Sequence, residues 1–209
     1  ILPSALSVGN YRIEEVAAPF GYVVSDKTVT ITVDTDTFYE VDEVAKAAII
    51  NVPFDDEPVR GELSVIKTGD VLVDYKDGEF VYENRGLSRA IFEVYAAEDI
   101  ATADNQVDDN GNRTLYYHSG DLVATLITGT DGKAVLSELP LGKYRVVEVT
   151  APSGFVINET VEDVTFEYVD DRTPVIEESV SFNNDRQKLS MSIVKKESET
   201  LETIAGAEF

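Results

Sequence analysis

Short runs of alternating apolar and polar residues recur along the chain. Val, Ile, Thr, Tyr and Phe fill these runs, and such residues suit a strand with one buried face. Pairs such as Asp77-Gly78 punctuate them and accept the positive φ of a tight hairpin turn. No segment has a sustained period of 3.6 residues, so the pattern predicts an all-β sandwich. The clearest runs are Thr28–Val33, Leu63–Ile66, Tyr144–Val147 and Ser179–Phe182.

The chain repeats itself. The segment Tyr11–Tyr22 returns as Tyr144–Phe155, at an offset of 133 residues between Glu15 and Glu148. The segment Leu63–Lys67 returns as Met191–Lys195, at an offset of 128 residues. A spacing of roughly 130 residues is the length of one sandwich domain.

The order of these segments predicts the domain organisation. We expect residues 1–58 to form the C-terminal half of a first repeat and residues 59–187 to form a complete repeat. Residues 188–209 then supply the N-terminal strand or strands of a third repeat, and the chain is predicted to be a fragment. The polar joints at 55–58 and 185–187 are short, which favours a stiff rod over loosely linked domains.

Composition excludes several classes of function. The 17 Lys and Arg residues face 40 Asp and Glu residues, for a formal charge of −23. That field repels phosphates and anionic lipids, so we expect neither a nucleic acid nor a membrane as partner. The chain has no Cys and a single His, His118, which excludes a thiol nucleophile, a disulfide framework and a His-rich zinc site. We expect no metal and no cofactor, and no run of about 18 apolar residues suggests a membrane span.

Polar residues stand among the apolar positions near several strand ends. Side chains alternate between the two faces of a strand. By this parity Lys67, Glu148 and Asn184 lie on the apolar faces of a first, a middle and a last strand. An unpaired buried charge is too costly, so these groups either meet one another or lie just beyond the rim of the core. Counterparts in the partial repeats are Glu15, Asn51 and Lys195.

The segment Leu139–Phe155 resembles the E-box of Cna B-type, SpaA-like domains, which build the stalks and pili of Gram-positive surface proteins. Lys67, Asn184 and the segment Ile204–Phe209 fit the same pattern. The resemblance covers nearly the whole chain and implies immunoglobulin-like or prealbumin-like β-sandwich repeats in tandem. The stretch Thr68–Ser88 departs from the family, because it is longer than the usual first hairpin, and we expect its insertion Tyr75-Lys76-Asp77-Gly78 in a loop.

The resemblance also implies a self-formed isopeptide crosslink between Lys67 and Asn184, assisted by Glu148. Burial favours the neutral forms of an amine and a carboxyl group. A neutral amine is a nucleophile, a protonated carboxyl group can polarise the amide and carry protons, and the fold supplies proximity. Asn183 is the alternative acceptor, although parity favours Asn184. The reaction happens once within one molecule, so the protein is not expected to be an enzyme.

Two functions follow as hypotheses. The first is a structural stalk or shaft repeat of a cell-wall-anchored, extracellular adhesin or pilin of a Gram-positive bacterium. Its partners are neighbouring repeats of the same protein, with host extracellular matrix or glycan bound through other domains. The alternative is an adhesin module that itself recognises a host protein or glycan. A binding module is expected to expose an apolar or aromatic patch, and the stretch Tyr75–Tyr82 is the candidate.

Two further features carry weaker expectations. His118 lies between aromatic residues and Ser119-Gly120, and we expect an exposed turn residue there. The stretch Asp104–Asn112 is acidic, but it lacks the spacing of an EF-hand calcium loop. A hairpin turn is the prediction for that stretch.

Overall fold

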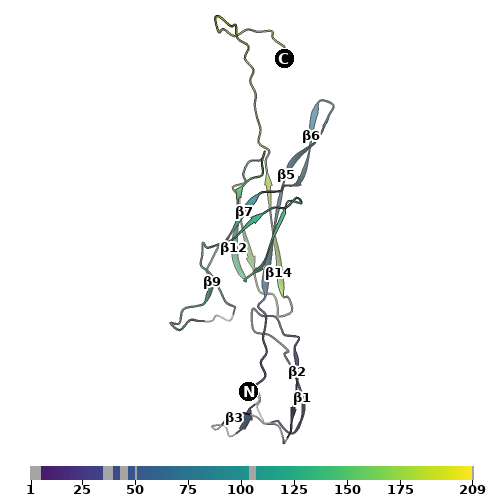
Figure 1. The fold of residues 1–209 in the computed structure, drawn as a ribbon, viewed down its shortest axis with the longest axis vertical. Helices are drawn as coiled ribbons and strands as arrows, with labels where there is room; N and C mark the ends of the chain where they lie inside the picture. The colour runs from purple at the N-terminus through teal and green to yellow at the C-terminus, as the bar shows by residue number, and fades with distance from the viewer. Residues whose placement is uncertain (1–5, 35–39, 43–46, 50, 104–106, 209) are drawn as a thin grey trace.

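The computed structural model describes residues 6–34, 40–42, 47–49, 51–103 and 107–208. All regular elements in these ranges are β-strands. Figure 1 shows an elongated molecule, with a sandwich in the middle, a small N-terminal part at one end and an extended C-terminal segment at the other. None of the described residues form a helix long and apolar enough to cross a membrane. The prediction of an all-β protein is confirmed.

Two facing sheets build the middle of the molecule. One has the strand order β10-β7-β12-β13, and the other has the order β11-β5-β14, with β6 paired to β5. The short pair β8 and β9 stands outside both sheets. The bounds are β5 Arg60–Lys76, β6 Glu79–Gly86, β7 Ile91–Ala96, β8 Ile100–Ala101, β9 Leu115–Tyr117, β10 Leu122–Ile127, β11 Lys133–Leu139, β12 Gly142–Thr150, β13 Val161–Phe166 and β14 Val175–Asn184.

The first and last strands of the sandwich are direct neighbours. Strands β5 and β14 run parallel, with Lys67 level with Phe182 and Gly69 level with Asn184. All other pairings between named strands are antiparallel. The parallel pair places the entrance of the chain into the sandwich at one end of the long axis and its exit at the other.

The core lies between the sheets and follows from the alternation in the sequence. From Arg60 to Gly69 the side chains of β5 alternate between half-buried and buried. Leu63 and Val65 pack there against Phe92, Tyr144 and other buried side chains. Burial of each large apolar side chain contributes about 1.5–3 kcal/mol, which fixes the register of the strands.

The inserted residues 75–78 form the tip of a regular hairpin. Strand β5 continues beyond the sandwich and pairs with β6 as far as Lys76 and Glu79. Asp77 and Gly78 form the turn with φ of 53° and 84°, as a two-residue hairpin turn requires. The expectation of a loop therefore holds for Asp77 and Gly78, whereas Tyr75 and Lys76 are the last residues of β5, because strand-forming residues continue up to the hairpin dipeptide.

The N-terminal part keeps pieces of the same design. Strands β1 (Gly9–Glu14) and β2 (Thr28–Val33) are antiparallel, and β3 (Glu40–Asp42) pairs with β4 (Ala47–Ile49). The strand predicted from the pattern of residues 28–33 is therefore confirmed to the residue. At the other end of the molecule, residues 188–208 are extended and include one isolated bridge, between Lys196 and Thr203.

Candidate functional site

Three polar side chains lie between the two sheets. Lys67 comes from the middle of β5, Asn184 from the end of β14, and Glu148 from β12 of the opposite sheet. Their exposed fractions are 0%, 2% and 5%, respectively. The structure thus brings together the three residues that strand parity places on apolar faces.

One carboxylate oxygen contacts both partners. Oε1 of Glu148 lies 3.2 Å from Nζ of Lys67 and accepts a hydrogen bond of 2.9 Å from Nδ2 of Asn184. Nζ of Lys67 also donates a hydrogen bond to the side-chain oxygen of Asn184. The other oxygen of Glu148, Oε2, is held by the backbone N–H of Asn158 at 2.7 Å. That second bond fixes the carboxylate while Oε1 faces the amine and the amide.

Aromatic rings surround the amine. Nζ of Lys67 lies 5.8 Å from the ring centres of both Phe92 and Phe182, which are 4.8 Å from each other. Burial lowers the pKa of Lys67, and the charge and hydrogen bond of Glu148 act in the opposite direction. The burial effect is the larger of the two, so the amine reaches its neutral, nucleophilic form more easily than a lysine in water.

The alternative acceptor Asn183 faces the other way. Its side chain is exposed, and its Oδ1 accepts hydrogen bonds of 2.8 Å from Asn84 and 3.1 Å from the hydroxyl of Thr68. This contact network lies on the outer surface of the sheet. The geometry therefore favours Asn184 as the partner of Lys67.

The N-terminal part contains a matching carboxylate. Oε2 of Glu15 accepts a 2.8 Å hydrogen bond from the backbone N–H of Ser25, ten positions further on, as Glu148 does from Asn158. The tyrosines four positions before these glutamates match as well. Tyr11 donates its hydroxyl hydrogen to the carbonyl oxygen of Ser7, and Tyr144 donates to that of Pro140.

The backbone contacts place Asp56, and not the predicted Asn51, at the position in the first repeat that Asn184 has in the second. Val23 N–H bonds the carbonyl oxygen of Glu57 in the first repeat, as Val156 N–H bonds that of Asp185 in the second. The residue before each carbonyl is Asp56 or Asn184, at the same offset of 128 residues that relates Lys67 to Lys195. Asn51 is exposed.

Asp56 meets Glu15 as Asn184 meets Glu148. Burial and a hydrogen bond with Glu15 raise the pKa of Asp56. Its Oδ1 is buried and has no hydrogen-bond partner among the described residues. The alignment of Val52–Asp56 with Val180–Asn184 could have found this residue, had the chemical type of the last residue been allowed to change.

The remaining candidates lie at the surface. Lys195 is exposed in the extended C-terminal segment. His118 is also exposed, and its Nδ1 lies 3.9 Å from Asp99. In the stretch predicted to be a hairpin turn, Asp108 accepts hydrogen bonds from the backbone of Asn110 and Asn112. Residues 104–106 lie outside the described ranges.

Comparisons with known proteins identify a family for most of the chain. The sequence profile of the SpaA prealbumin-like fold domain matches residues 1–47 and 81–180. The solved structure of the Bacillus anthracis TIE protein is 26% identical, with a TM-score of 0.48, over 87% of this chain and 26% of that one. A minor pilin of Streptococcus agalactiae is 23% identical, with a TM-score of 0.39, over 67% and 51%.

The major pilin SpaA of Corynebacterium diphtheriae, whose structure points to a modular pilus assembly stabilizing isopeptide bonds, is 18% identical. Its TM-score is 0.38, over 81% of this chain and 41% of that one. The chain thus spans between about a quarter and a half of the length of these proteins. No curated protein sequence matches it.

Proposed function

The chain belongs to the SpaA prealbumin-like fold family, and we propose that it is a structural repeat from the stalk or shaft of a Gram-positive adhesin or pilus at the cell surface. In this proposal the complete repeat closes an amide bond between Lys67 and Asn184. One observation carries the proposal: Oε1 of Glu148 contacts both the nucleophilic amine and the amide nitrogen that must leave.

The reaction needs no component beyond these side chains. A proton passes from the ammonium of Lys67 to Glu148, which leaves a neutral amine beside a carboxylic acid. Nζ attacks Cγ of Asn184 and forms a new C–N bond; Glu148 gives its proton to Nδ2 and takes up the second proton that Nζ must lose. The bond from Cγ to Nδ2 breaks, and ammonia leaves. The product is one amide linking β5 to β14, and the enclosed site replaces an external catalyst by fixed proximity.

Intact mass spectrometry tests this step. The folded chain is expected to weigh one ammonia less than its composition requires. Lys67→Ala and Glu148→Ala are expected to have their full masses, whereas Lys133→Ala, which removes an exposed lysine of β11, keeps the deficit. A wild-type chain at its full mass would refute the crosslink.

The pair Glu15 and Asp56 supports a related bond in the first repeat. Glu15 has the backbone contact of Glu148, and Asp56 has the position of Asn184. We propose that this repeat joins a lysine to Asp56 with loss of water instead of ammonia. The lysine would come from a strand equivalent to β5, which residues 1–58 do not include. A longer chain that contains the whole first repeat, including the strand equivalent to β5, is expected to lose one water and one ammonia.

A binding function is the second candidate, and one observation favours it. Tyr75 and Phe80, in the stretch singled out from the sequence, are 62% and 61% exposed at the tip of the β5–β6 hairpin. An exposed aromatic patch of this kind marks a contact surface.

A further inference from the structure

The β5–β6 hairpin carries its large apolar side chains on one face. Tyr75 is level with Phe80 in the ladder, and Leu72 is level with Tyr82. Residues that are directly opposite in a ladder point to the same side, so these four side chains share a face. The rings of Tyr75 and Phe80 lie 5.0 Å apart and pack on each other.

Tyr82 shows where this face points. The guanidinium carbon of Arg186 lies 3.4 Å from the centre of the Tyr82 ring, a close cation–π contact. Arg186 belongs to the segment that leaves the sandwich after β14. Figure 1 shows the hairpin projecting from the same end of the sandwich as this segment. The aromatic face is therefore turned towards the path of the chain into the next repeat.

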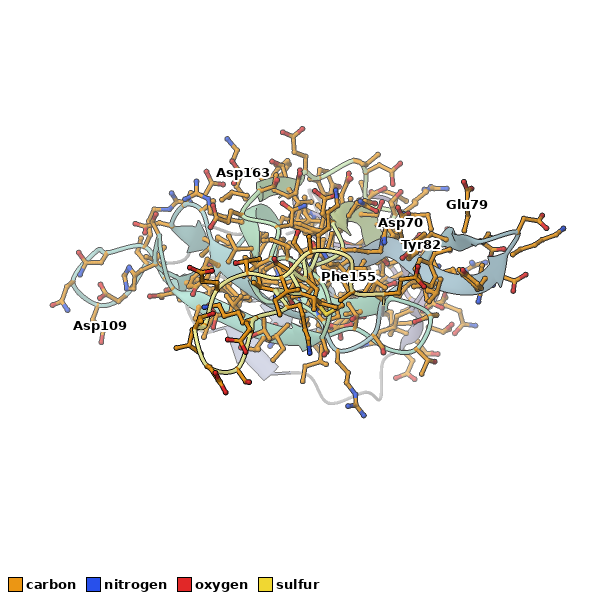
Figure 2. The ribbon with its side chains drawn as sticks, turned by 90° about the horizontal axis from the view of Figure 1, so that it is seen from above. Asp70, Glu79, Tyr82, Asp109, Phe155 and Asp163 are labelled. Carbon is orange, nitrogen blue, oxygen red and sulfur yellow. The ribbon has the colours of Figure 1, made fainter. Side chains whose placement is uncertain are left out.

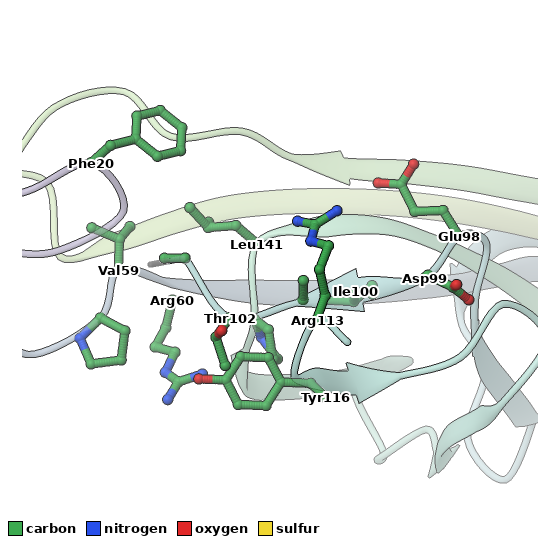
Figure 3. Close-up of a pocket in the computed structure, with 14 residues that line it drawn as sticks. Phe20, Val59, Arg60, Glu98, Asp99, Ile100, Thr102, Arg113, Tyr116 and Leu141 are labelled. Atoms are coloured by element: carbon green, nitrogen blue, oxygen red, sulfur yellow. The ribbon is translucent and has the colours of Figure 1, made fainter. Parts of the chain in front are cut away.

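The junction between the first and the middle repeat shows what lies next to the counterpart of Arg186. Tyr22 pairs with Pro58 there, as Phe155 pairs with Arg186 at the second junction, so Pro58 is the counterpart of Arg186. Pro58 lines a cavity of about 360 Å³ (Figure 3). The wall of this cavity also includes Phe20, Arg60, Thr102, Arg113 and Tyr116.

The cavity fits two aromatic rings in size and chemistry. A cavity of about 150 Å³ holds one benzene ring, so about 360 Å³ holds two. The guanidinium of Arg60 already lies 5.6 Å from the ring centre of Tyr116, which makes a wall suited to further ring stacking. Oγ1 of Thr102 is buried without a hydrogen-bond partner in the described ranges, and it can accept the hydroxyl hydrogen that a buried tyrosine must donate.

The reach of the hairpin agrees with this fit. Phe80 stands two residues beyond Tyr82, or about 7 Å along the strand. Arg60 stands two residues beyond Pro58 on the extended chain, so Phe80 and the counterpart of Arg60 come level. The tip also carries Asp77 and Glu79, which can pair with Arg60 and Arg113 of the cavity, although Glu98 and Asp99 line the same cavity.

The docking also depends on which side of the long axis the hairpin and the cavity lie. Figure 2, viewed along the long axis, shows Glu79 and Tyr82 of the hairpin on one side of the molecule and Asp109, next to the cavity strands, on the opposite side. Figure 1 shows β1 to the right of the long axis and its counterpart β12 to the left. The docking requires a change of side of this kind between consecutive repeats.

We propose that the aromatic tip of the hairpin, Tyr75 and Phe80, docks into the following repeat, in the equivalent of the cavity between Arg60 and Tyr116. The occupant of that cavity is thus the hairpin of the preceding repeat of the same polypeptide. The contact acts as a strut that stiffens the joint between repeats. It rests on the tandem arrangement in the proposed function but not on the amide bond.

A designed disulfide tests the contact. The test protein joins residues 1–187 directly to a second copy of residues 60–187. Gln187 corresponds to Val59, so the second copy starts at the residue that follows Val59 in the natural order. Phe80→Cys in the first copy is combined with Tyr116→Cys in the second. The protein has no Cys of its own, so this is the only thiol pair. A bridge requires Cα atoms within about 7 Å, and we expect it to form at a rate independent of protein concentration.

Val81→Cys is the matched control, because Val81 leaves the hairpin from the opposite face and is also exposed. It is expected to crosslink to the same cysteine about tenfold more slowly, because its thiol points away from the cavity. Equal rates for the two pairs, or no bridge, would overturn the docking. In that case we would interpret the exposed patch as a binding surface for a host glycan or protein.

The two proposals fail separately. Intact mass after reduction reports the loss of ammonia in each copy, whereas the crosslinking rate reports docking. Docking is also expected in Lys67→Ala chains, since the hairpin lies outside the buried site. Chains with the ammonia deficit but without selective crosslinking would retain the stalk function and lose only the strut.

Discussion

Removal of the two buried charges changes the stability in opposite directions with and without the amide bond. The change is the pair Lys67→Met and Glu148→Gln, which removes both charges at nearly constant volume. No unpaired charge is left in the core, which a single substitution would leave behind. The two outcomes with and without the bond then differ in direction.

The size of the effect follows from the loop that the bond closes. Lys67 and Asn184 are 117 positions apart. In the chain-entropy account of crosslinks, a loop of this length contributes about 5 kcal/mol to folding. For a repeat of this size that corresponds to a fall in Tm of about 20 °C when the bond cannot form. If the wild-type protein has no bond, the same pair of changes replaces a buried ion pair by neutral groups and is neutral or stabilising by about 1–4 kcal/mol.

Differential scanning calorimetry of the middle repeat gives the answer, and intact mass identifies the chemical state of each sample. Lys133→Met is the control for a lysine on the surface and is expected to leave Tm within about 2 °C of the wild type. An unchanged or higher Tm in the double variant would refute the reasoning from loop closure.

Two predictions concern pH. In Glu148→Gln chains Lys67 stays unreacted, and burial lowers its pKa from 10.5. The contribution of the neutral amine to stability is therefore full above pH 10.5 and is lost as pH falls through the pKa of the folded state. Calorimetry of the double variant, which has no amine, is expected to lack this dependence of Tm on pH. The pKa of Asp56 is raised from 3.8, so its contribution to stability is full below pH 3.8 and is lost as pH rises through the raised value. The protection factor of the Ser25 amide, which removes the intrinsic pH dependence of exchange, is expected to rise on mild acidification, and the same rise in Asp56→Asn would contradict this.

The meeting of Lys67, Glu148 and Asn184 was predictable from sequence because strand parity is a local property. Each residue stands two or four positions from a buried apolar side chain, and the alternation decides its face without knowledge of the fold. The distances among them were not predictable, since they depend on the parallel pairing of β5 with β14 and on the opposition of the two sheets.

Asp56 and the cavity were missed for different reasons. Asp56 does not repeat the residue type of Asn184, so matching the two repeats by identical residues does not find it. An aspartate at the same register can nevertheless form the same amide, with water as the leaving group. The cavity has no periodic signature. Its walls come from the first repeat, from the joint and from the irregular stretch around β8 and β9, and only the tertiary structure brings these together.

The position of the proposed bond has a mechanical consequence. A pull along the molecule enters the middle repeat at Val59 and leaves after Asn184. With an amide from Lys67 to Asn184, the covalent path runs through the first half of β5 and directly into the exit segment. The 116 residues between the two partners carry no load, so unfolding them cannot lengthen the chain. Without the amide, the same pull would shear the parallel ladder of β5 and β14 and extend all of them. The strut and the amide then act in sequence along the rod, the first resisting bending at the joint and the second resisting extension within the repeat.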